Sequence, residues 1–298
     1  MRRWIGRIAI GSVLALVVAG CGNPAGVDGE LTDDWAAIPE PVTFVPESDT
    51  CHPRLERVGS LLAYQPVDCA KPHIAETLHL GTVTGADAHR DTPPLPGSPG
   101  RRAVRADCEK RVNERLGGDW RTARLGLSVV LPSASGWRGG ARWYRCDVHE
   151  ARSVEDNTPV RRSGSLRDVL RTPSELALGC FRPKIVDGSL EGMEAVPCTA
   201  RHRSEFAGIW TAPDLSYEEF VKDDERAHRG CRGVIARYTG IPNDGNLRYR
   251  VGSIYYYPNE EDWRDGHRGV QCFLWMDDRD LTRSMKGVGP SGFPIRYA

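Results

Sequence analysis

Apolar positions recur along the chain with the period of a helix in two places. Between Ser216 and Gly240, apolar side chains recur every three or four residues after a Ser-Tyr-Glu-Glu segment with the spacing of a capping box, which predicts a helix. A shorter pattern of the same period ends at Gly117-Gly118. Each pattern places a cysteine, Cys108 or Cys231, on its apolar face, so both cysteines are expected to be buried.

Segments rich in β-branched and aromatic residues surround the two predicted helices and predict strands. They are residues 127–131, 143–148, 195–198, 206–210, 249–257 and 270–275. Each half of the folded chain is therefore expected to be a small α+β unit with strands first, one central helix and closing strands.

The first 20 residues have the pattern of an export signal. Met1-Arg2-Arg3 precedes an apolar stretch from Ile8 to Ala19, which is shorter than the roughly 20 residues that span a bilayer. Val18-Ala19-Gly20-Cys21 resembles the lipobox of bacterial lipoproteins, which implies that Cys21 is lipidated; a plain signal peptide is the alternative. Residues 1–20 are thus predicted to be a lipoprotein signal peptide, and the mature chain is expected at the outer face of the cell membrane.

Charge and composition describe the part that follows the signal. The whole chain has 40 basic and 40 acidic residues, and removal of residues 1–20 leaves 37 basic residues and a formal charge of −3. That balance indicates no nucleic-acid partner. Residues 21–50 are rich in Gly, Pro and acidic residues, which predicts a tether between the anchor and the folded part.

The remaining eight cysteines follow a pattern that occurs twice. Two pairs of cysteines lie 18 positions apart, and each second cysteine opens a Cys-x3-His-x2-Glu motif. A third cysteine in each set is followed nine positions later by glycine, and the fourth ends a Pro-x4-Trp-x8-Cys motif. The two sets are Cys51, Cys69, Cys108 and Cys146, and Cys180, Cys198, Cys231 and Cys272.

Each set is also followed by a serine, an apolar residue and a basic residue, at 165–167 and at 284–286. Agreement at so many residue types predicts two tandem copies of one disulfide-bonded module, at residues 51–170 and 171–298. A period this long indicates two whole domains rather than a solenoid.

An even number of cysteines in an exported chain favours disulfides, which stabilise small domains by about 3–4 kcal/mol each in the chain-entropy model. Pairing within a copy allows three connectivities. We favour the one that staples neighbouring strands and ties the helix to the last strand, which pairs Cys51 with Cys69, Cys108 with Cys146, Cys180 with Cys198 and Cys231 with Cys272.

The second copy resembles the septum-formation domain of actinobacterial lipoproteins and membrane proteins. The resemblance rests on Gly179-Cys180-Phe181, on Val196-Pro197-Cys198 with His202 and Glu205, and on Val270-Gln271-Cys272, and it spans most of residues 178–290. The first copy keeps residues 67–73 and Glu76 of the motif but lacks the Gly and Phe beside Cys51. The resemblance implies a link to cell division and no enzymatic activity.

His73 with Glu76 and His202 with Glu205 are the only histidine–carboxylate pairs that recur, so they are the candidate binding residues. Acid–base or metal chemistry is one interpretation, and hydrogen bonds that hold a strand end are the other. On a regular strand, residues three apart point to opposite faces and cannot share a ligand, whereas a turn after the cysteine would bring them together.

No other catalytic or cofactor site is predicted. Zinc binding by Cys-x3-His competes with oxidation of the same sulfurs, and no Cys-x-x-Cys or nucleophile elbow is present. The aromatic residues around Tyr255-Tyr256-Tyr257 and Trp143-Tyr144 could line a groove for a glycan or peptide, or they could form core. We expect a non-enzymatic, lipid-anchored binding module for an envelope protein or wall polymer, without a cofactor or metal; a wall-directed hydrolase or a metal-binding module is the alternative.

Overall fold

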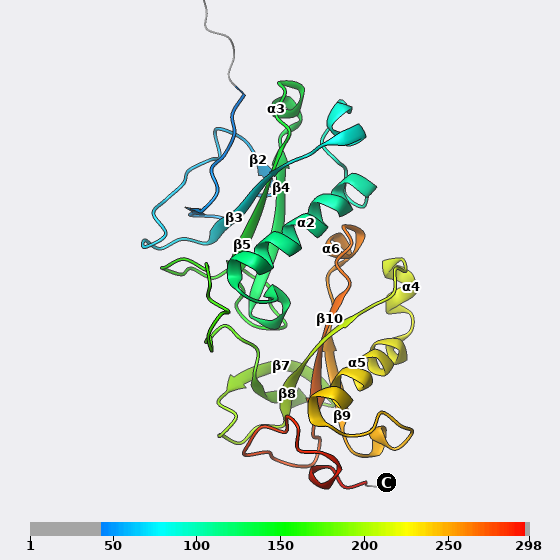
Figure 1. The fold of residues 1–298 in the computed structure, drawn as a ribbon. Coiled ribbons are helices and arrows are strands. Elements are labelled where there is room, and N and C mark those ends of the chain that lie inside the picture. The colour runs from blue at the N-terminus through cyan, green and yellow to red at the C-terminus, as the bar shows by residue number, and fades with distance from the viewer. Residues whose placement is uncertain (1–42, 296–298) are drawn as a thin grey trace, which may run out of the picture. The chain divides into compact units, whose positions relative to one another are not determined.

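The computed structural model describes residues 43–295, which belong to one compact unit (Figure 1). The predicted signal peptide, Cys21 and residues 22–42 of the predicted tether lie outside the described residues. Within the described part of the chain, no helix has both the length and the apolar character that crossing a membrane requires. The chain from residue 43 already contacts a sheet, because the Trp143 indole donates a hydrogen bond to the Phe44 carbonyl at 2.8 Å.

The first five strands form one sheet in the order β1-β3-β5-β4-β2. Only β2 and β4 are paired in parallel in this sheet. The long helix α2 contacts β3, β4 and β5, and the short helix α3 connects β4 to β5. The elements are β1 Thr50–His52, β2 Val58–Gly59, β3 Ala75–Thr82, η1 Gly85–His89, α2 Pro99–Leu116, η2 Trp120–Thr122, β4 Leu125–Pro132, α3 Ala134–Arg138 and β5 Trp143–Glu150.

The other five strands form a second sheet, antiparallel throughout, in the order β7-β6-β8-β10-β9. Helix α5 contacts β8, β9 and β10, and the short helix α6 connects β9 to β10. The elements are β6 Cys180–Val186, β7 Ser189–Val196, β8 Ser204–Thr211, α4 Tyr217–Val221, α5 Asp224–Thr239, η3 Leu247–Tyr249, β9 Gly252–Tyr256, α6 Glu260–Arg264, β10 Gly269–Trp275 and η4 Pro290–Gly292.

The two sheets share one connectivity, which Figure 1 allows the reader to follow within each of them. In both, three strands, a long helix, a strand, a short helix and a last strand follow one another, and the second region adds the short helix α4 before its long helix. The four matching strands are ordered β1-β3-β5-β4 and β6-β8-β10-β9. Each sheet has one further strand of its own, β2 beside β4 and β7 beside β6. The fold is thus mixed α and β with two sheets. Below, residues 43–178 are called the first region and residues 179–295 the second region.

The predicted helix between Ser216 and Gly240 is two helices. The capping box is present at the start of α4, where the Ser216 and Glu219 side chains bond each other's backbone N–H groups. The interruption comes at Asp223, because its side chain accepts a hydrogen bond from the N–H of Arg226 and so starts α5 as a new N-cap. Both long helices end at a glycine in the left-handed conformation, Gly117 at φ 78° and Gly240 at φ 77°.

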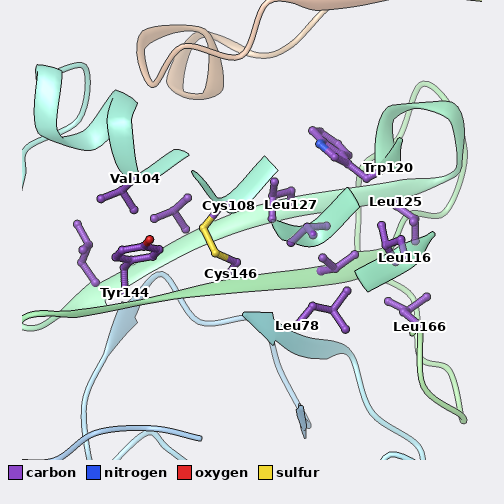
Figure 2. Packing of buried hydrophobic residues seen from close by; sticks show 14 of the residues in the cluster. Leu78, Val104, Cys108, Leu116, Trp120, Leu125, Leu127, Tyr144, Cys146 and Leu166 are labelled. Carbon is purple, nitrogen blue, oxygen red and sulfur yellow. A yellow bond between two sulfur atoms is a disulfide. The ribbon is translucent and has the colours of Figure 1, made fainter. Parts of the chain in front are cut away.

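The core of the first region lies between α2 and the sheet, around the Cys108–Cys146 disulfide (Figure 2). Leu78 of β3, Leu127 of β4 and Val104 of α2 pack in it, and all three are buried. The second region has a corresponding core around Cys231 and Cys272, with Trp263 of α6 buried in it. The helix face that the sequence pattern predicts to be apolar is therefore the buried face in both regions.

Candidate functional site

The structure contains four disulfides, and they are the pairs that the sequence favours. Cys51–Cys69 and Cys180–Cys198 link β1 or β6 to the segment that leads into the recurring histidine, with Cα–Cα distances of 5.2 and 5.1 Å. The other two bridges tie the long helix to the last strand, at 5.4 and 5.2 Å. Both cysteines of each helix bridge are fully buried, whereas Cys69 and Cys198 are half-buried.

His202 and Glu205 form a direct contact in the second region. Nε2 of His202 lies 2.9 Å from Oε1 of Glu205, and both side chains have 0% exposure. His202 is not on a regular strand: it forms an isolated bridge with Leu281, and a bend at Arg203 separates it from β8. The bend cancels the alternation of faces, so two residues three positions apart point into one site.

One proton must lie between the two side chains. Nδ1 of His202 is 2.8 Å from the carbonyl oxygen of Ala200, and a carbonyl oxygen can only accept, so Nδ1 carries a hydrogen. The contact between Nε2 and the carboxylate then requires a further proton on one of the two atoms. The pair is consequently either an imidazolium with a carboxylate or a neutral imidazole with a carboxylic acid, and it holds the same number of protons in both forms.

The Glu205 carboxylate also accepts hydrogen bonds from distant parts of the chain. The Tyr238 hydroxyl at the end of α5 donates to Oε2 at 2.8 Å, and burial raises the pKa of this tyrosine well above its ordinary value, which keeps the donor protonated. Ser284 Oγ donates at 3.1 Å and the Met285 N–H at 2.9 Å. Glu205 therefore connects the start of β8, the end of α5 and the segment after β10.

In the first region, Ser165 and Leu166 bind the matching glutamate but the matching histidine does not contact it. Glu76 accepts hydrogen bonds from Ser165 Oγ at 2.6 Å and from the Leu166 N–H at 2.5 Å, and Nδ1 of His73 lies 2.8 Å from the Lys71 carbonyl. Nε2 of His73, however, is buried without a hydrogen-bond partner. The first region thus brings its glutamate to the equivalent place but does not join it to the imidazole.

The segment that donates to each glutamate is a short strap, residues 162–170 in the first region and residues 281–289 in the second. Each strap begins by pairing its backbone with the recurring histidine, through Arg162 or Leu281. The backbone N–H groups of the third and fifth residues after the motif serine donate to carbonyl oxygens at the end of the long helix. These bonds are Asp168 N to Arg115 O at 2.8 Å, Leu170 N to Leu116 O at 2.9 Å, Gly287 N to Tyr238 O at 2.9 Å and Gly289 N to Thr239 O at 2.8 Å.

The straps explain why Ser-apolar-basic follows each set of cysteines. The serine hydroxyl and the next N–H bind the glutamate, and the apolar residue, Leu166 or Met285, enters the core. The buried carboxylate satisfies donors that would otherwise be buried without a partner. In both regions the glutamate therefore has a structural role, because it fastens the strap across the strand and the helix.

A buried polar network in the first region has no equivalent in the sequence-based prediction. The Arg145 guanidinium contacts Asp147 at 2.7 Å and Glu56 at 2.9 Å, and all three are buried. Thr77 donates to Asp147 at 2.7 Å and contacts Nε2 of His52 at 2.9 Å. Burial lowers the pKa of His52 to about 4.

The signal for this network is the alternation Arg-Cys-Asp-Val-His at residues 145–149, which places the polar side chains on one face of β5. Such a face would ordinarily meet water. Here it is buried, since residues of the 43–67 segment such as Glu56 and His52 lie against it. Periodicity alone does not show that a second layer covers that face.

Most of the aromatic residues considered for a groove are core. Trp137, Trp143, Tyr144 and Trp263 are buried. Tyr256 and Trp275 pack with Phe273 in a cluster of their own. A partly exposed group remains beside α4 and α5, where the rings of Tyr255 and Tyr257 stack at 6.0 Å and Tyr217 lies 6.2 Å from Tyr257, which is 39% exposed.

Two groups among the described residues combine the donor atoms that a metal ion needs. One is Cys180, His202 and Glu205, and the other is Cys51, Cys69 and Glu76; within each group the donor atoms lie within 4.8 Å of one another. All of these cysteines are in disulfides, so their sulfurs are not thiolates in this structure. Only the second-region group includes an imidazole.

Comparison with known proteins adds one finding. No curated protein and no solved structure matches the chain significantly. A family model described as septum formation matches residues 49–272, a span that runs from before β1 into β10 and includes all eight described cysteines and both histidine–glutamate pairs. The chain therefore belongs to the septum-formation family.

Proposed function

We propose that the chain is a non-enzymatic, lipid-anchored envelope protein that acts in septum formation by binding another envelope component. The family membership is the observation that carries the link to septum formation and cell division. The anchor rests on Cys21 and the small residues before it. The partner, an envelope protein or a wall polymer, would be bound at the outer face of the cell membrane.

We further propose that the two regions are tandem copies of one module. The shared strand order, the two types of disulfide and the two straps support this proposal. A common ancestor accounts for hydrogen bonds at matched positions, such as Ser165 with Glu76 and Ser284 with Glu205, more simply than independent origins do.

The position of the recurring histidines and glutamates supports binding rather than hydrolysis. A general base must lie within hydrogen-bond reach of its substrate. His73, Glu76, His202 and Glu205 have at most 2% exposure, and both glutamates are occupied by their straps. These four side chains are thereby out of reach of a protein or polymer partner, and binding of such a partner would use exposed surface such as Tyr217, Tyr255 and Tyr257.

Capture from isolated envelope tests the binding proposal. The mature chain without its lipid is immobilised and mixed with solubilised envelope proteins and with purified wall polymer, and the retained material is identified. Retention of one specific component is expected, and the double variant Tyr255→Ala/Tyr257→Ala should weaken it if the aromatic group is the binding surface. The matched variant Leu61→Ser/Leu62→Ser alters the exposed apolar residues of the first region. Capture of neither protein nor polymer would contradict the proposal.

Lipidation is tested separately with a labelled fatty acid. The full chain is expected to take up label and to sediment with membranes, and Cys21→Ser should lose both properties. Label that persists in Cys21→Ser would contradict the anchor without bearing on the binding proposal.

A further inference from the structure

We propose that the Cys180–Cys198 disulfide is a redox switch over a Zn²⁺ site. In the oxidised chain the His202–Glu205 pair holds a proton beside the disulfide. After reduction, the sulfurs of Cys180 and Cys198, Nε2 of His202 and the Glu205 carboxylate would bind one Zn²⁺ ion. Two cysteines, a histidine and a carboxylate are all ordinary zinc ligands, and four of them complete a tetrahedral site.

The positions of the donor atoms support this proposal. The sulfur of Cys180, a ring nitrogen of His202 and an oxygen of Glu205 lie within 4.8 Å of one another. Cys180 and Glu205 are direct partners in the β6–β8 ladder, so the sheet holds them together whether or not the disulfide is present. Cys180 also pairs with Val196 in the β6–β7 ladder, which keeps Cys198, two residues further on, close to it.

The hydrogen bonds around the ligands are those of an oriented metal site. A metal-binding histidine commonly donates its second N–H to a carbonyl or carboxylate, which fixes its tautomer. Nδ1 of His202 does so with the Ala200 carbonyl and leaves Nε2 directed at Glu205. The carboxylate is itself positioned by Tyr238 at 2.8 Å and Ser284 at 3.1 Å. The ligands would need little rearrangement to bind the ion.

The partial exposure of Cys198 makes this bridge more readily reducible than the two helix bridges. Cys198 is half-buried, whereas both cysteines of each helix bridge are fully buried. A dithiol reductant would attack Cys198 Sγ, the S–S bond would break and Cys180 would leave as a thiolate; the second reductant thiol would then displace Cys198 and close the reductant's own disulfide. The two protons of the dithiol end on Cys180 and Cys198.

Zinc binding would then displace protons. The ion replaces the protons of both thiols, so zinc binding should release protons. A purely structural disulfide would release none on addition of zinc.

The first region is an internal control for the proposal. It has the same disulfide, and Cys51 is paired with Glu76 in the β1–β3 ladder as Cys180 is with Glu205. His73, however, is not part of its donor group. The first region should bind zinc more weakly after reduction, because its group of converging donor atoms contains no imidazole, whereas the second-region group includes that of His202.

The test uses the exported chain, reduced with a phosphine under argon, freed of reductant and titrated with Zn²⁺ against a chromophoric chelator. One tightly bound ion per reduced chain and none per oxidised chain are expected. Tyr238→Phe should weaken binding roughly 10-fold. His202→Gln should weaken it more than that, and His73→Gln should leave it unchanged. Calorimetry in two buffers of different ionisation enthalpy counts the released protons.

Binding of cobalt(II) to the wild-type chain gives a second measurement that does not depend on the folding of His202→Gln. The reduced wild-type chain should show thiolate-to-cobalt charge-transfer absorption of the intensity given by two sulfurs, with its circular dichroism retained. Equal zinc affinity of wild type and folded His202→Gln, equal metal binding by the oxidised chain, absence of the charge-transfer band, or unfolding on mild reduction would each overturn the proposal.

Discussion

The backbone N–H of Met285 donates a 2.9 Å hydrogen bond to Glu205, a residue 80 positions earlier in the chain. This bond fixes the position of the segment after the last strand relative to a carboxylate at the start of β8. The first region repeats the relationship with Leu166 and Glu76. The fold of each region therefore depends on a buried carboxyl group whose hydrogen-bond partners come from the opposite end of that region.

Removal of the carboxylate should strongly destabilise the protein. In Glu205→Ala, the Met285 N–H, the Tyr238 hydroxyl and the His202 imidazole lose their buried acceptor, so the free energy of unfolding should fall by about 3–5 kcal/mol. Denaturant unfolding followed by tryptophan fluorescence measures the change.

Two variants control that measurement. Glu205→Gln keeps an acceptor oxygen and should lose less stability than Glu205→Ala. Glu191→Ala removes an exposed carboxylate paired with Lys184, and it should cost less than about 1 kcal/mol. If Glu205→Ala unfolds at the same denaturant concentration as Glu191→Ala, the strap does not depend on Glu205.

The sequence predicts the parts of this architecture that depend on local pattern. Residues 127–131 and 143–148 are rich in strand-forming residues, and they lie within strands β4 and β5. The left-handed ends of the helices follow from Gly117 and Gly240, because glycine adopts positive φ without a steric penalty. Cysteine spacing likewise indicates which sulfurs can be neighbours.

Features that depend on distant partners could not be predicted from pattern. Strand β3 reads Ala-Glu-Thr-Leu-His-Leu-Gly-Thr, and its first polar residues are buried because Ser165 and Asp147 satisfy them from far along the chain. The contact between His202 and Glu205 depends on a bend at Arg203, where neither glycine nor proline indicates a turn. The sequence therefore left open whether this pair has a structural role or a role in acid–base or metal chemistry.

His52 should make the protein less stable in acid. Burial lowers its pKa from 6.5 to about 4, so the folded protein keeps this histidine neutral while the unfolded chain protonates it below pH 6.5. The unfolded state then binds more protons, and the contribution of His52, fully present above pH 6.5, is lost as the pH falls towards 4. The loss should amount to about 3 kcal/mol, at 1.36 kcal/mol per pKa unit.

Unfolding free energies at pH 7.5 and pH 4.5 measure this effect, with His52→Gln as the variant that cannot titrate. The difference between the two pH values should be smaller in His52→Gln than in the wild type. His89→Gln, which replaces an exposed histidine in η1, is the matched control. An identical pH dependence in the wild type and His52→Gln would show that His52 is not the titrating group.

Gly240→Ala should cost about 1 kcal/mol through backbone conformation alone. Gly240 has φ 77°, and a Cβ there would meet its nearest atoms at 3.8 Å, so there is space for the methyl group and only the left-handed backbone is penalised. Gly179→Ala is the control, because its added Cβ meets nothing within 4 Å and its φ lies outside that region. Thermal unfolding of both variants gives the comparison; equal stability would mean that α5 ends without strain in the variant.

The two kinds of disulfide should differ in their order of reduction. Thiol exchange requires access to a sulfur, and only the bridges that include Cys69 and Cys198 have a half-buried cysteine. Alkylation of the native chain without reductant should label none of the eight cysteines. Under increasing reductant, label should appear first at the Cys51–Cys69 and Cys180–Cys198 bridges and later at Cys108–Cys146 and Cys231–Cys272. Peptide mapping by mass spectrometry follows each site.

The helix bridges are buried in the two cores, so their reduction should coincide with loss of tertiary structure. Label at Cys231 while the protein is still folded would contradict that coupling.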